Sequence, residues 1–328
     1  MNILGIETSC DETSAALVRD HVFVRSNVVA SSLKEHAQFG GIIPEIASRR
    51  QMELIQPVVQ AALEKARTGF DDIDAIAVTR RPGLLGSLLV GLSFARGLAR
   101  ALNKPLVEVD HIQAHLYANF LRLPEQSHDP YPSLPAIGLV VSGGHTTLFK
   151  ITDFEHFRLL GETRDDAAGE AFDKVARILG LGYPGGPAID LLAKQGVTNE
   201  IRFPSASLKE SLDFSFSGTK TAVLYYVRKH QKEEGYSTAK VSYAFQKSVV
   251  DVLVEKSLQA CRRQRINTLL IGGGVAANSF LRTQLSTKAR QQDIQVHFPP
   301  LSLCLDNAAM IAGLGGRQLT AKSNFAIK

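Results

Sequence analysis

The chain has 328 residues, of which 45% are hydrophobic and 21% are charged. This length predicts two domains, and the composition excludes a disordered chain. The net charge of +5 permits a polyanionic partner without requiring one.

The amino-terminal part of the chain predicts two strands joined by a polar turn. Residues 3–6 form an apolar strand, residues 8–13 a polar turn, and residues 14–19 a second strand. A similar unit returns at 137–151, with the turn Ser142-Gly143-Gly144-His145. The repeat predicts that the chain contains two related lobes.

A second pair of segments supports this division. The strands 75–78 and 268–271 each run into a turn rich in glycine or proline and then into a helical pattern. Such a unit places backbone N–H groups at a helix N-terminus, where phosphate binds. The helical pattern at 51–65 has an apolar face typical of a core helix. Together these elements predict an α/β fold.

Two histidines follow the strand 106–109. His111 and His115 are four residues apart, so a helix opening here would carry both imidazoles on one face. With a carboxylate from elsewhere they would make a facial metal site with open positions. A zincin protease would need glutamate where this chain has Ile112, which disfavours peptidase chemistry. The alternative interpretation is a polar helix face.

Two glycine turns are candidates for anion or nucleotide binding. The turn from Val141 to His145 would let backbone amides approach an anion, although a plain hairpin is equally compatible with it. Three glycines at 272–274 follow a buried strand, and Asn278 beyond them could bind a ribose or base.

Three carboxylates remain open between a functional and a structural interpretation. Asp173 and Asp190 flank a glycine-proline loop and could accept bonds from ribose hydroxyls, or they could lie on solvated helix faces. Asp306 precedes a helix of small residues and could be its N-cap.

Seven ordered motifs give the chain its resemblance to a known family. They are Ile6–Thr13, Asp110–His115, Val141–His145, Gly169–Lys174, Phe214–Thr221, Gly272–Asn278 and Asp306–Met310. Together they resemble the tRNA threonylcarbamoyladenosine transferases, whose two-lobed fold is that of the sugar kinase, Hsp70 and actin (ASKHA) superfamily. The chain departs from the family pattern at Arg81 and Thr219, where glycine and leucine are usual. The Arg80-Arg81 pair is either a tRNA phosphate contact or a solvated turn.

The resemblance implies a role for each matching residue. A metal, iron or alternatively zinc, would be held by His111, His115 and Asp306. Asp11 and Glu12 would steer the acceptor amine. The donor would be bound by Val141, Ser142, Gly143, Gly144, His145, Asp173, Gly186, Asp190 and Asn278.

The implied reaction transfers a threonylcarbamoyl group from L-threonylcarbamoyl-AMP to N6 of adenosine 37 in tRNAs reading ANN codons. The implied partners are an inactive paralogue and a P-loop ATPase. The same fold would also suit an ATP-binding scaffold or a small-molecule kinase.

The expected lobes are residues 1–108 with 308–328, and residues 109–307, with the donor and metal site at their interface. Three widely spaced cysteines, the lack of an export signal and the lack of about 18 unbroken apolar residues predict a cytoplasmic protein without a membrane span.

Overall fold

The computed structural model describes residues 1–37, 39, 41–124, 131–204 and 210–325. Two compact units make up the chain: Met1–Pro132 with Pro299–Lys328, and Ser133–Phe298. We call them unit 1 and unit 2.

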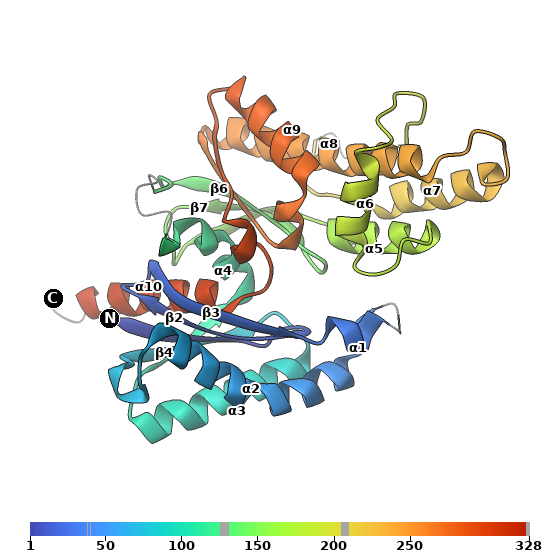
Figure 1. The fold of residues 1–328 in the computed structure, drawn as a ribbon. Helices are drawn as coiled ribbons and strands as arrows, with labels where there is room; N and C mark the ends of the chain where they lie inside the picture. Colours follow the sequence, from blue (N-terminus) through green and yellow to red (C-terminus); the bar gives the residue numbers. More distant parts are fainter. Residues whose placement is uncertain (38, 40, 125–130, 205–209, 326–328) are drawn as a thin grey trace. The chain divides into compact units, whose positions relative to one another are not determined.

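Unit 1 is a five-stranded sheet covered by helices on both faces (Figure 1). Its strands are β1 (Asn2–Glu7), β2 (Glu12–Arg19), β3 (Phe23–Ser31), β4 (Ala75–Arg81) and β5 (Leu106–Asp110). Its helices are α1 (Leu33–Ala37), α2 (Pro44–Ala66), α3 (Leu85–Leu102), α4 (His111–Tyr117) and α10 (Ala308–Phe325), with 3-10 turns at Phe70–Asp72, Ala118–Phe120 and Leu301–Leu303.

The strand order in unit 1 is β3-β2-β1-β4-β5. The strands β1, β2 and β3 pair antiparallel, whereas β4 and β5 continue the sheet parallel to β1. Helices α2 and α3 bury the main apolar cluster with the sheet, and α10 packs against β1, β2, β4 and β5. Cover on both faces explains why β1 reads as an unbroken apolar run.

Unit 2 repeats this plan. Its strands are β6 (Ala136–Val141), β7 (Thr146–Ile151), β8 (Phe157–Glu162), β9 (Thr268–Gly272) and β10 (Gln295–His297). Its helices are α5 (Ala168–Ile178), α6 (Gly185–Ala193), α7 (Ser217–His230), α8 (Thr238–Gln264) and α9 (Ser279–Arg290), with a 3-10 turn at Gly274–Ala277. The strand order β8-β7-β6-β9-β10 matches that of unit 1, which confirms the repeat predicted from the two strand-turn-strand segments.

The unit boundaries differ from the predicted ones. The prediction ended the first lobe at residue 108 and resumed it at 308, whereas the structure keeps the chain in unit 1 as far as Pro132 and returns it at Pro299. The reason is that α4, directly after β5, packs against α10 of the same unit. The sequence between residues 109 and 132 therefore belongs with the strands that precede it.

Helix α3 is rich in apolar residues. Among the described residues it is the one helix long and apolar enough to cross a membrane, with a mean hydropathy of 1.3 and 28% of it buried. It packs against α2 and β4, and Arg96 and Arg100 interrupt its apolar sequence. A single helix of this kind is weak evidence for a membrane span.

Candidate functional site

The parallel strands of unit 1 end at one edge of the sheet, and two histidines follow that edge. The chain passes from β5 directly into α4, whose first residue is His111. Asp110 Oδ1 accepts hydrogen bonds from the backbone N–H groups of Ile112 and Gln113, at 3.1 and 3.2 Å, and so caps the helix. The predicted helix start is thereby confirmed, and His111 and His115 lie on one face of it.

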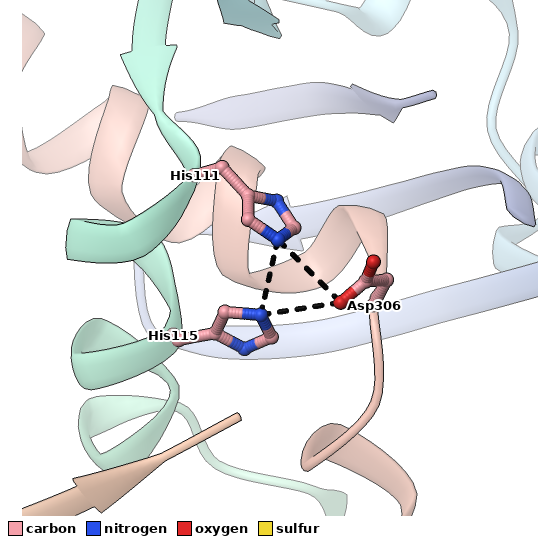
Figure 2. Close-up of side chains that lie close together, drawn as sticks. All are labelled: His111, His115 and Asp306. Atoms are coloured by element: carbon pink, nitrogen blue, oxygen red, sulfur yellow. Dashed lines mark hydrogen bonds and ion pairs between the residues drawn. The ribbon is translucent and has the colours of Figure 1, made fainter. Parts of the chain in front are cut away.

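Asp306 reaches the histidines because α10 begins directly on β1. A Cβ atom at Gly5 would lie 2.2 Å from the carbonyl oxygen of Ala308, so only glycine permits this approach. The backbone N–H of Ala308 also donates to Ser14 Oγ at 2.9 Å. The N-cap of α10 is Asn307, whose Oδ1 accepts from the backbone N–H of Met310. Asp306 is therefore not the helix cap, and its carboxylate faces the two imidazoles (Figure 2).

Three potential ligand atoms converge here. His111 Nε2 and His115 Nε2 are 3.1 Å apart, and Asp306 Oδ1 lies 3.5 Å from the first and 3.2 Å from the second. Ligands at about 2.1 Å from one metal ion would be separated by about 3.0 Å at right angles and about 3.4 Å at the tetrahedral angle. The donor set and its spacing therefore fit a metal ion bound by two nitrogens and one oxygen.

The surroundings of this triad are acidic. Burial opposes ionisation of Asp306, but His111 beside it holds the pKa of that carboxyl well below its usual range. Burial, together with Asp306 and Asp11, raises the pKa of Glu12 to about 10. Several carboxyl groups thus share a small volume, which a bound cation would stabilise electrostatically.

The two imidazoles have different environments. Burial opposes protonation of His111, but the carboxylates of Glu7 and Asp306 outweigh it and raise its pKa. Burial lowers the pKa of His115, whose Nδ1 has no hydrogen-bond partner among the described residues. Both ring nitrogens of His111 therefore have polar partners, whereas, within the described part of the chain, His115 has partners only at Nε2.

The predicted lobe bounds assigned His111, His115 and Asp306 to the second lobe, residues 109–307. All three ligands lie in unit 1, because residues 109–132 and 299–307 belong to it. The three ligands thus all come from unit 1.

The predicted donor residues lie in unit 2. In the turn after β6, Ser142 N donates to His145 O at 2.8 Å, and His145 N donates to Ser142 Oγ at 3.2 Å. Gly143 and Gly144 are exposed, and a Cβ atom at either would meet nothing within 4 Å. This side of the turn is therefore open to a ligand.

Two other segments meet that turn. The backbone N–H of Gly169 at the start of α5 donates to Ser142 O at 3.1 Å. Gly273, with φ of 90°, lies against the backbone of Val141, so a side chain there would be strained and would also clash. The turn after β6, the start of α5 and the glycine turn after β9 are thus neighbours, as parallel strands β6 and β9 require.

The remaining donor candidates are bound to protein groups. Asp173 accepts from Gly185 N at 2.7 Å, next to Gly186, and burial raises the pKa of Asp173. Asp190 accepts from the backbone N–H and the hydroxyl of Ser279, at 3.2 and 3.0 Å.

Asn278 is the N-cap of α9. Its Oδ1 accepts from Leu281 N at 2.9 Å, and its Nδ2 donates to Gln246 Oε1 at 2.8 Å. Asn278 therefore has a structural role in this conformation whether or not it also contacts a ligand.

Glu7 was not among the site residues predicted from the sequence. It is fully buried at the end of β1, and its Oε2 lies 2.9 Å from His111 Nδ1. The available signal was an acidic residue directly after the apolar strand 3–6, at a sheet edge that also carries histidines.

Arg80 and Arg81 are both exposed and both paired. Arg80 lies 3.5 Å from a carboxylate oxygen of Glu108, and Arg81 lies 3.4 Å from one of Asp110. Exposed pairs of this kind contribute little to stability and reduce the local positive charge. The geometry favours the solvated turn over a dedicated phosphate contact.

Comparison with known proteins agrees with the geometry. The family model of tRNA N6-adenosine threonylcarbamoyltransferase matches residues 23–313. A protein of that name from Clostridium botulinum (strain 657 / Type Ba4) is 53% identical over 313 residues, which cover 95% of this chain and 90% of the relative. Another, from Moorella thermoacetica, is also 53% identical, over 94% of this chain and 90% of the relative.

Solved structures support the fold. Full-length HypF in a phosphate- and nucleotide-bound form aligns with 97% of this chain and 55% of its own, with a TM-score of 0.63 and 15% identity. Component A of (R)-2-hydroxyglutaryl-CoA dehydratase from Acidaminococcus fermentans aligns with 98% of this chain and 99% of its own, with a TM-score of 0.56 and 14% identity. At these identities the likeness concerns the fold alone, which is the predicted two-lobed ASKHA type.

Proposed function

This chain belongs to the tRNA N6-adenosine threonylcarbamoyltransferase family, and from that premise we propose that it carries out the family reaction with L-threonylcarbamoyl-AMP as donor. The acceptor is N6 of adenosine 37 in tRNAs that read ANN codons. The N6 nitrogen attacks the carbamoyl carbon, a new N–C bond forms, the bond from that carbon to the phosphate oxygen breaks, and AMP leaves with the electron pair while N6 loses a proton. The enzyme acts in the cytoplasm, where tRNA is its substrate.

The observation that carries the proposal is the convergence of His111, His115 and Asp306 in a chain of this family. Two imidazoles and one carboxylate form a facial set that leaves coordination positions open, which suits Fe²⁺ first and Zn²⁺ as the alternative. When bound, the ion would supply Lewis-acid polarisation of a substrate oxygen.

Residues of unit 2 hold the donor in this proposal. The turn from Val141 to His145 binds the phosphate of the leaving AMP through backbone amides, since Gly143 and Gly144 leave one side of it open. Asp173, Gly186, Asp190 and Asn278 bind the adenosine portion. Catalysis then comes from positioning the two substrates and from stabilising charge on the departing phosphate.

Asp11 and Glu12 steer the acceptor amine. Asp11 lies on the turn between β1 and β2, Glu12 is the first residue of β2, and Asp306 contributes to the raised pKa of Glu12. A carboxyl oxygen there is suited to accept a hydrogen bond from N6–H in either protonation state of the group.

A reconstituted transfer assay tests the proposal. Wild type and His115→Ala, each with both protein partners, are incubated with donor and with tRNA that carries either adenosine or guanosine at position 37. Modified nucleoside and AMP are then quantified. We expect equal amounts of both products, only with adenosine 37, and their loss in the variant. Binding of ATP without binding of the adenylate would instead favour the scaffold or kinase reading of the same fold.

The proposal includes two protein partners, an inactive paralogue and a P-loop ATPase. An exposed apolar surface supports a protein partner: Leu85 and Leu89 on α3 are 75% and 54% exposed, and Met52 on α2 is 63% exposed. Helices α2 and α3 pack against each other, and exposed apolar side chains on neighbouring helices are typical of an interface.

The partner proposal is tested with Leu89→Arg, using Leu191→Arg on α6 as the control at another exposed leucine. We expect the first variant to lose co-elution with the paralogue and the second to retain it. We also expect little turnover from the isolated chain and a gain when both partners are added. Full multiple turnover by the chain alone would contradict this.

A further inference from the structure

Glu7 lies where three strand ends meet. Strands β1, β4 and β5 are parallel neighbours, and Glu7, Thr79 and Asp110 lie at or near their carboxyl ends. His111 follows β5, so the carboxylate of Glu7 reaches it across the end of β4. The side chain has no solvent exposure.

Two hydrogen bonds, from residues outside α4, are directed toward this carboxylate. Oε1 accepts from the backbone N–H of Ser9, and Oε2 accepts from the hydroxyl of Thr79. Oε2 also lies 2.9 Å from His111 Nδ1, whereas the hydroxyl of Ser9 is farther from that nitrogen, at 3.3 Å. A buried carboxylate held from two other elements is fixed in place before it meets the imidazole.

The chemistry of this contact fixes which nitrogen of His111 is the ligand. Both carboxyl oxygens of Glu7 already accept hydrogen bonds, and as an acceptor toward Nδ1 the group requires the proton of the shared hydrogen bond to lie on that nitrogen. The ring is oriented by the same contact, and Nε2 then faces His115 Nε2 and Asp306 Oδ1. His115 has no comparable support, since its Nδ1 lacks a partner among the described residues.

We propose that Glu7 is a positioning residue for the metal ligand His111, which it holds as the tautomer with Nε2 free to bind the ion. Carboxylate partners of metal-bound histidines commonly have this effect on ligand orientation and basicity. The inference rests on the proposed metal site. The competing explanation is that Glu7 only fastens the turn after β1 through Ser9 and Thr79.

The test compares Zn²⁺ affinity, by competition with a chelator or by calorimetric titration for weak variants, in wild type and Glu7→Gln. Ser26→Ala is the control, because Ser26 is a buried polar residue of the same sheet that accepts from Leu17 N, away from the site. We expect Glu7→Gln to bind Zn²⁺ about 10- to 100-fold more weakly and Ser26→Ala to match wild type. Thermal unfolding of the metal-free proteins establishes that both variants fold.

The same substitution in a second variant protein distinguishes positioning of His111 from stabilisation of the turn after β1. In His111→Ala protein, adding Glu7→Gln should change Zn²⁺ affinity no further, because the residue through which Glu7 acts is gone. An equal loss of affinity in both backgrounds would overturn the proposal in favour of the fastening role.

Wild-type protein gives a reading that does not depend on any variant folding. With ¹⁵N-histidine labelling and bound Zn²⁺, long-range NMR correlations should show a proton on His111 Nδ1 and the metal on Nε2. A deprotonated Nδ1, or equal Zn²⁺ affinity of wild type and Glu7→Gln, would refute the role of Glu7 and leave the metal site standing. Failure of wild type to bind Zn²⁺ at all would refute the metal site and this inference together.

Discussion

Replacing Gly5 with alanine should both destabilise unit 1 and weaken metal binding. The added Cβ atom would lie 2.2 Å from the carbonyl oxygen of Ala308 and 2.8 Å from the backbone nitrogen of Ala312. Both contacts are with the backbone of α10, so no flexible side chain can move aside. The start of the helix must shift away from β1, and Asp306, two residues before it, must shift as well.

The expected cost of this overpacking is about 2 to 3 kcal/mol in the free energy of unfolding. Urea denaturation of the metal-free protein measures it. Displacement of a ligand should also weaken Zn²⁺ binding at least about tenfold, since ligand geometry sets affinity.

The matched control is Gly97→Ala on α3, where an added Cβ atom meets nothing within 4 Å. It should stabilise the protein by up to about 1 kcal/mol through helix propensity and leave Zn²⁺ affinity unchanged. If Gly5→Ala behaved like Gly97→Ala in both measurements, α10 would not be seated on β1 as described, and the account of how Asp306 reaches the histidines would be wrong.

Three further predictions concern other parts of the site. Asn278→Ala should lower the free energy of unfolding by about 1 kcal/mol even without donor, because a helix cap is lost. The control Ser237→Ala, which removes the cap of α8, should lower the free energy of unfolding by as much but leave adenylate affinity unchanged. Equal adenylate affinity in both variants would show that Asn278 is not part of the donor site. Because the pKa of Glu12 is raised to about 10 in the folded protein, the folded state binds an extra proton above pH 4.5 and loses stability as pH rises. Glu12→Gln removes this effect. In metal-free protein the variant should be more stable than wild type by about 1 kcal/mol or more at pH 8 and about equally stable at pH 4. A difference in denaturation midpoints that does not change with pH would contradict this. His115→Ala should abolish the rise in unfolding temperature that Zn²⁺ gives wild type, since an ion bound only by the folded state stabilises by mass action. Retention of stoichiometric metal by elemental analysis would show that His115 is not a ligand.

The sequence by itself determined the elements and the local geometry of the histidines. Period-two and unbroken apolar runs identify the strands, and their repetition identifies two related units, because these patterns depend only on which side chains must be buried. The spacing of His111 and His115 places both rings on one face of a helix for the same local reason. Both predictions are confirmed by the described structure.

Only the tertiary structure decided which distant residues join that face. In the sequence Asp306 is equally compatible with a helix cap, and it becomes a partner of the histidines because Gly5 lets α10 lie directly on β1. Glu7 gains its role because parallel strand pairing brings the ends of β1 and β5 to one edge of the sheet. The unit boundary moved from residue 108 to 132 for a related reason, the packing of α4 on α10. Each of these outcomes depends on contacts between segments far apart in the chain, which composition and periodicity within one segment do not encode.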